Sequence, residues 1–308
     1  MSDFTSAKTS HRHGVISVLV ALPFVSLTGL FGKFLTFSPL LIVQGRTVFA
    51  FGALLLALFF LRKKIFFSDL REWLWLALSG SILGVHWIAF FQAIQVSTVA
   101  IGLLSFASYP LFTTLLEPLF FREPLRVRNV IAALIVICGL ALMATSSSDD
   151  SNTIISGSIF HGILWGLMAG FGFAVLTLLN RGHVRKHSAL LITCWQNGFA
   201  ALVILPWSLS ESWILSGKEL GLLFLLGVVC TVGGHTLLIN GLRHVRAQVA
   251  SLLIAGLEPV FAILFALFLL GEVPSLQTLL GGVLIISTTV FIIYGTEQKE
   301  IPEQAVSK

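Results

Sequence analysis

The sequence predicts an all-α integral membrane protein with ten transmembrane helices, arranged as two inverted five-helix repeats. Three observations predict this class: the composition, the lengths of the apolar runs and an internal duplication. Of the 308 residues, 56% are hydrophobic and 11% are charged, whereas a soluble domain carries roughly 25% charged residues. Such a chain cannot bury its apolar surface in water, so the predicted solvent is a lipid bilayer.

Ten apolar runs are long enough to cross a bilayer, since a spanning helix needs about 20 predominantly apolar residues. Backbone polar groups in lipid must be satisfied within the segment, which predicts a helix for each run. The fifth run is the shortest. The runs cover residues 14–32, 39–61, 73–94, 98–121, 129–145, 157–180, 188–209, 220–240, 247–270 and 275–294.

The first run is predicted to remain in the protein. Its length and basic flank would also fit a cleaved signal peptide. However, Gly14 and Ala21 fall on Gly162 and Ala169 of the sixth run at an offset of 148, so the first run has a counterpart. The predicted regions are a cytoplasmic tail (1–13), a first repeat (14–145), an extracytoplasmic linker (146–156), a second repeat (157–294) and a cytoplasmic tail (295–308).

The duplication is clearest from the third run to the end of the fourth. His and Pro are scarce in this chain, which has 8 and 9 of them, so their coincidence at one offset indicates a true repeat. At an offset of 149, His86 falls on His235, Pro110 on Pro259 and Glu123 on Glu272.

Loop charges predict the orientation of the bundle. With both termini inside, sixteen of the nineteen Lys and Arg lie in cytoplasmic segments, as the positive-inside rule requires. An odd number of helices per repeat turns the second copy upside down, and the charges agree: the loop 95–97 is uncharged, whereas its counterpart 243–246 is basic. The cytoplasmic residues are Lys8, Arg12, Arg62, Lys63, Lys64, Arg71, Arg122, Arg126, Arg128, Arg181, Arg185, Lys186, Arg243, Arg246, Lys299 and Lys308.

Inverted repeats of this kind build secondary transporters, with a substrate site near the midplane. Two five-helix copies, each with a Pro-bearing fourth helix and a following Glu, resemble the EamA-like branch of the drug/metabolite transporter superfamily. The motifs that carry the resemblance are the segments 109–112 and 257–261, with Glu123, Glu272 and Arg46.

The resemblance implies a ten-helix permease of a bacterial inner membrane that exports amino acids or similar metabolites. It also leaves open a carrier of drugs or phosphorylated metabolites. The implied partners are a small-molecule substrate and lipid, in a monomer or a homodimer.

Four ionisable residues within the runs are candidates for substrate binding or coupling. Such groups are costly in a membrane and usually face the bundle interior or a wet cavity. His86 and His235 could carry protons or could simply hydrogen-bond helices together. Glu258 could accept an ammonium group or a proton, or could serve the kink at Pro259. Arg46 could hold a carboxylate or phosphate, pair with Glu258, or extend to the surface.

Pro110 and Pro259 are predicted hinges, because proline removes a helical N–H at equivalent places in the two repeats. The alternative is a fixed kink. Further polar or aromatic residues within the runs are expected either to line the cavity or to join helices. These are Trp87, Gln44, Trp195, Asn197 and Asn240.

No cofactor, metal site or nucleic-acid interface is predicted. Cys138, Cys194 and Cys230 lie in apolar runs without metal-ligand spacing. A membrane-embedded enzyme is the alternative from another class, but the sequence has no H-E-x-x-H, G-x-S-x-G or P-loop motif. A subunit without a ligand would leave the intramembrane ionisable residues unexplained. Alternating access by a permease, with protons as a candidate coupling ion, is therefore the predicted mechanism.

Overall fold

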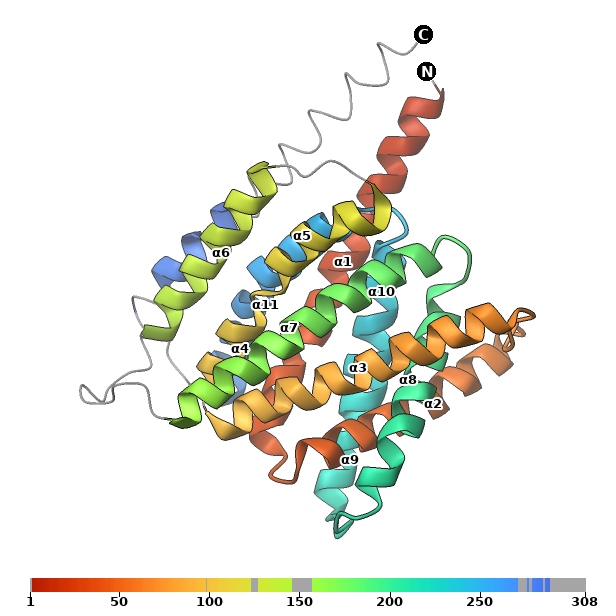
Figure 1. The fold of residues 1–308 in the computed structure, drawn as a ribbon, viewed down its shortest axis with the longest axis vertical. Helices are drawn as coiled ribbons and strands as arrows, with labels where there is room; N and C mark the ends of the chain where they lie inside the picture. The colour runs from red at the N-terminus through yellow and green to blue at the C-terminus, as the bar shows by residue number, and fades with distance from the viewer. Residues whose placement is uncertain are drawn as a thin grey trace.

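The computed structural model describes residues 2–97, 99–122, 127–145, 157–270, 276, 279–284 and 286–288. Every regular element in these ranges is a helix (Figure 1). The elements are α1 (Ser2–Phe34), α2 (Pro39–Phe60), α3 (Leu70–Val96), α4 (Val99–Phe106), α5 (Tyr109–Phe121), α6 (Val127–Thr145), α7 (Gly157–His183), α8 (Ala189–Ser208), α9 (Gly217–Leu225), the π-helix η1 (Leu226–His235), α10 (Thr236–Gly241) and α11 (Ala247–Leu270).

Within the described residues, seven helical spans are long and apolar enough to cross a membrane, and they coincide with seven of the ten predicted runs. The remaining runs differ in form: the fourth is divided between α4 and α5, and the fifth is the shorter helix α6. Half of the tenth run, the linker 146–156, the tail 295–308, Glu123 and Glu272 lie outside the described residues. The seven spans are His11–Gly32, Pro39–Phe60, Leu70–Val96, Phe160–His183, Ala189–Ser208, Gly217–Gly241 and Ala247–Leu269.

Two boundaries differ from the sequence expectation. Helix α1 begins at Ser2, so the segment expected to be a polar tail continues the first helix. The fourth run is interrupted at Ala107 and Ser108, and α5 begins with Pro110 in its first turn. Proline is tolerated there because the first N–H groups of a helix have no intrahelical partner. By contrast, α11 continues without a break through Pro259. The two predicted hinge positions therefore have different backbones.

The packing of the helices follows the duplication. Helix α1 packs along α11, and its counterpart α7 packs along α4 and α5. Likewise α3 packs along α7, and the counterpart of α3, formed by α9, η1 and α10, packs along α1. The counterparts α2 and α8 pack on each other. Equivalent pairs in the two halves therefore meet in equivalent ways, which is the arrangement expected of the repeats.

The π-helix η1 lies in the middle of the eighth span. Thr231 Oγ1 donates a hydrogen bond to the Leu226 carbonyl five residues earlier, at 2.8 Å. Close packing fixes η1 against α2: a Cβ added to Gly227 would lie 2.7 Å from the Arg46 carbonyl oxygen. Short π segments occur often at functional sites, and this one presents Thr231 and His235 to the interior.

Candidate functional site

Arg46 lies at the centre of the bundle and is 1% exposed. Its Nε and Nη2 atoms donate to Thr231 Oγ1 at 3.2 and 3.0 Å, and its guanidinium carbon lies 3.6 Å from the centroid of the Trp87 ring. A guanidinium stacked on indole gains cation–π energy, which is larger where water is excluded. Arg46 thus neither extends to the surface nor, among the described residues, forms an ion pair with Glu258.

One donor of Arg46 is available for a ligand. In the described part of the chain, Nη1 is buried and has no hydrogen-bond partner. A buried cationic donor without a partner is costly, because it has lost its hydration without replacement. This atom is therefore the strongest indication of where an anionic ligand group would bind.

The two predicted histidines have different surroundings. His235 lies on η1 with its ring edge-on to Trp87, at 4.9 Å between centroids, so it borders the Arg46 site. His86 instead faces α7, where its Nδ1 lies 2.8 Å from the Ala169 carbonyl oxygen, a geometry in which an Nδ1–H donates. His86 therefore forms a contact between α3 and α7, and its ring also packs against Phe106 and Phe173, at 5.6 and 5.2 Å between centroids.

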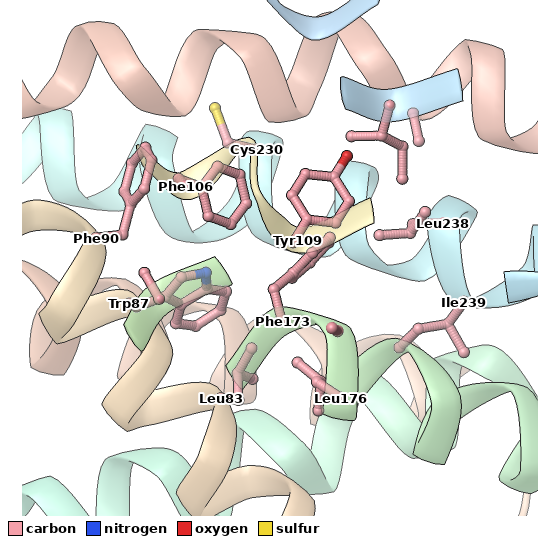
Figure 2. Close-up of a cluster of buried hydrophobic side chains, with 14 of the residues drawn as sticks. Leu83, Trp87, Phe90, Phe106, Tyr109, Phe173, Leu176, Cys230, Leu238 and Ile239 are labelled. Atoms are coloured by element: carbon pink, nitrogen blue, oxygen red, sulfur yellow. The ribbon is translucent and has the colours of Figure 1, made fainter. Parts of the chain in front are cut away.

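An aromatic cluster borders this site. It consists of Trp87, Phe90, Phe106, Tyr109 and Phe173, which converge from α3, α4, α5 and α7 (Figure 2). The Tyr109 ring lies 4.9 Å from Phe106 and 5.0 Å from Phe173, measured between centroids. An aromatic wall with a few polar groups is a typical lining for a small-ligand site. The sequence analysis singled out only Trp87 of this cluster, because aromatic residues are frequent throughout the chain.

Glu258 is the carboxylate nearest to this region on α11. Its backbone carbonyl accepts a hydrogen bond from Ser26 Oγ at 3.0 Å, and it is 9% exposed. Among the described residues, no hydrogen bond or ion pair to its carboxylate is recorded. Tyr109 occupies the equivalent position of the first repeat, since the two are 149 residues apart and each precedes a proline. That offset was the sequence signal that could have identified Tyr109.

The remaining predicted residues are dispersed. Gln44 is buried, and its Oε1 has no partner in the described ranges. Asn197 donates to the Thr193 carbonyl of its own helix at 2.8 Å. Trp195 donates to the Ile65 carbonyl at 2.7 Å, in the loop after α2, and therefore joins helices away from Arg46. Asn240 is exposed on α10.

A second polar feature lies at the end of the bundle that carries most of the arginines, hereafter the basic end. Glu117 is fully buried, and its Oε1 lies 2.7 Å from Arg181 Nη1. The same carboxylate accepts from the backbone N–H groups of Ala247 and Gln248 at 2.8 and 3.3 Å, so it caps α11. A carboxylate is favourable at a helix N-terminus. The sequence alone does not show which helix lies beside Glu117, so this contact emerges only from the structure.

Further hydrogen bonds extend this contact between α5 and α11. Gln248 Nε2 donates to the Thr114 carbonyl at 3.2 Å, Ser251 Oγ donates to Thr113 Oγ1 at 3.1 Å, and the Tyr109 hydroxyl donates to the Ser251 carbonyl at 2.9 Å. Asn129 of α6 donates to Gln248 Oε1 at 2.6 Å. We call this set the polar seam: Tyr109, Thr113, Thr114, Glu117, Asn129, Arg181, Gln248 and Ser251.

The described residues contain no cluster of three or more His, Cys, Asp or Glu that could hold a metal ion. The arrangement instead offers a buried guanidinium, a carboxylate and an aromatic wall. Such groups bind and orient a small molecule, and together they complement one that carries both charges.

The chain is similar in sequence to known proteins. The sequence model described as the EamA-like transporter family matches residues 12–145 and 160–294. An uncharacterized transporter of Bacillus subtilis, YwfM, is 28% identical over 81% of this chain and 84% of its own. The S-adenosylmethionine uptake transporter of Rickettsia prowazekii is 31% identical over 67% of this chain and 66% of its own.

The fold also resembles a solved structure. A crystal structure matches with a TM-score of 0.76 and 16% sequence identity, covering 95% of this chain and 99% of that one. This likeness concerns the arrangement of the helices alone.

Proposed function

Because this chain belongs to the EamA-like transporter family, we propose that it is a permease for an amino acid or an amino-acid derivative that carries a cationic group. The proposed mechanism is alternating access, in which the two repeats move around a central site. The observation that carries the substrate class is Arg46 Nη1, a buried donor with no partner in the described residues.

The charges of the site fit such a substrate. A substrate carboxylate would accept from Arg46 Nη1, and an ammonium or sulfonium group would be attracted to Glu258 and to the aromatic cluster. S-adenosylmethionine has a carboxylate, an ammonium, a sulfonium and a flat base. Since the Rickettsia relatives are named for its uptake, it is the first compound to test.

The direction of transport and its coupling to protons form the second part of the proposal. The family resemblance favoured export, whereas these relatives are named for uptake. A carrier that alternates around one site runs in either direction, according to the gradients of substrate and coupling ion. His235 and Glu258 are the proposed proton-responsive groups, because the His86 ring is already engaged by the Ala169 carbonyl, whereas His235 borders the Arg46 site through Trp87.

The test is transport of labelled S-adenosylmethionine and of labelled neutral amino acids into proteoliposomes, with and without a pH gradient. Arg46→Gln is expected to reduce uptake at least about tenfold, since a charge-assisted hydrogen bond contributes about 1.5–3 kcal/mol. Uptake by Arg46→Lys should lie between that of the native protein and that of Arg46→Gln, because lysine keeps the charge but loses the planar donor fork. Glu258→Gln should reduce uptake of S-adenosylmethionine more than that of a neutral amino acid.

Arg71→Gln is the matched control, because Arg71 is an exposed arginine at the start of α3. Each variant is compared with the native protein by its unfolding temperature in detergent. If Arg46→Gln is folded and transports S-adenosylmethionine and the amino acids as the native protein does, the proposed site is wrong.

A further inference from the structure

A pocket opens at the basic end, away from the central site. It has a volume of about 90 Å³. Its walls come from three parts of the chain: the start of α1, the end of α7, and the loop between α10 and α11 with the first turns of α11. The lining residues are His11, Arg181, Arg185, Arg243, His244, Val245, Arg246 and Val249.

The lining is strongly cationic. Four of its eight residues are arginines and two are histidines, and none of the described residues that line it is acidic. The nearest carboxylate is Glu117, which is already engaged by Arg181 at 2.7 Å and by the N-terminus of α11. Among the described residues that line the pocket, no carboxylate accompanies Arg185 or Arg243, so the positive charges of these two arginines are not balanced there.

Two of the arginines are held in place by the protein. Arg243 donates from Nε to the Val184 carbonyl at 2.9 Å and from Nη2 to the His187 carbonyl at 2.8 Å. Arg181 is held by Glu117. A guanidinium has five N–H donors, so the two contacts of Arg243 orient it without using all of its donors. Fixed guanidinium groups bind oxyanions with less loss of side-chain entropy.

His244 reports the electrostatics of the pocket. Burial lowers its pKa, and the nearby Arg243 and His13 lower it further. A second cation is therefore disfavoured at this place, whereas a bound anion would raise the pKa of His244 by stabilising the imidazolium.

Membrane topology alone explains basic residues on one side of a bilayer, but it does not require them to converge in a pocket. Residues separated by more than 200 positions in the sequence, such as His11 and Arg243, line the same space. Basic pockets between transmembrane helices on the cytoplasmic side bind phospholipid headgroups, and arginine forks match phosphate geometry.

We propose that this pocket binds a phosphate-bearing anion at the basic end of the bundle. Either the headgroup of an anionic phospholipid or free phosphate has this chemistry. The site is separate from the proposed transport site, so its failure would leave the proposed function standing.

The first test is native mass spectrometry of the full chain in detergent with phosphatidylglycerol or phosphatidylcholine added. The native protein should retain phosphatidylglycerol preferentially. The double variant Arg185→Gln/Arg246→Gln should bind it about tenfold or more weakly, because each basic residue near the headgroup contributes to the attraction. The matched control is Lys63→Gln/Lys64→Gln, which removes the same charge from exposed positions after α2, outside the pocket.

The second test is histidine NMR, with the His244 signal assigned from its loss in His244→Gln. The pKa of His244 should rise when the anion binds. A rise with phosphatidylglycerol but not with inorganic phosphate identifies a lipid headgroup, and a rise with phosphate alone identifies a free anion. Equal lipid retention by the pocket variant and the lysine variant, together with a pKa of His244 that neither anion changes, would overturn the proposal.

Discussion

At the scale of single residues, the two repeat-related histidines have different contacts. Both are buried, at 4% and 6% exposure. His86 contacts the Ala169 carbonyl, whereas His235 contacts Trp87. Equivalent positions in a duplicated sequence therefore need not share a function, because each faces a different partner after folding.

We expect His86→Asn to transport like the native protein and to keep its dependence on a pH gradient. Asparagine Nδ2 can replace the Nδ1–H donor to Ala169, while it cannot titrate near neutral pH. His86→Leu lacks the donor and should lower the free energy of unfolding by about 1 kcal/mol. Uptake assays at imposed pH gradients check the first statement and denaturant unfolding checks the second.

A loss of gradient dependence in folded His86→Asn would contradict this assignment. It would instead make His86 part of the coupling, which was the alternative open from the sequence. The matched variant is His235→Asn, which is expected to alter transport because His235 borders Trp87 and Arg46.

At the scale of helices, Glu117 ties three of them together. It links α5, on which it lies, to Arg181 of α7 and to the N-terminus of α11. Removing one partner of a buried pair leaves an uncompensated charge, whereas replacing both with apolar residues is often neutral. The contact can therefore be tested by comparing single and double variants.

We expect Glu117→Gln to destabilise the protein by about 3–5 kcal/mol, because Arg181 is then left buried without its carboxylate. Glu117→Gln/Arg181→Met should recover most of that loss. Denaturant-induced unfolding of the protein in detergent gives the free energy of unfolding of both variants. The single variant Arg181→Met completes the comparison. If the loss of unfolding free energy in the double variant equals the sum of the losses in the two single variants, then Glu117 and Arg181 act independently and the ion pair has no coupling energy.

At the scale of the whole molecule, the two ends of the α5–α11 contact are not equivalent. The polar seam occupies the basic end. At an offset of 149, its members Glu117, Gln248 and Ser251 correspond to Ala266, Val99 and Gly102. In an inverted repeat, closing one end or the other uses equivalent helix pairs. We therefore expect the polar contacts to stabilise closure at the basic end more than closure at the opposite end.

We accordingly expect the substrate-free protein to rest with its basic end closed. Spin labels at Leu119 and Arg185 report the basic end, and labels at Phe268 and Phe34 report the other end, in a Cys138→Ala background. Pulsed electron–electron double resonance should give one narrow distance distribution for the pair at the basic end and a broader distribution for the pair at the other end. Glu117→Gln should broaden the first pair.

A narrow distance at Phe268 and Phe34 combined with a broad one at Leu119 and Arg185 would contradict this preference. Labels on Leu56 and Phe60, both exposed on α2, provide a pair within one helix whose distance should not change in any variant.

The sequence by itself determined the fold class, the repeats and most of the spans. Apolar runs of sufficient length must form helices in lipid, since the backbone has no other way to satisfy its hydrogen bonds. It also identified Arg46 and Glu258, because ionisable residues inside a membrane are rare enough to be conspicuous.

Only the tertiary structure decided which of these residues meet. It placed Thr231 and Trp87 on Arg46, turned His86 towards α7, and brought Glu117 to the start of α11. These contacts join residues that are between 41 positions (Arg46 and Trp87) and 185 positions (Arg46 and Thr231) apart in the sequence. Hydropathy and periodicity describe a segment and its solvent, whereas the choice of partner depends on how the helices rotate and cross when they pack.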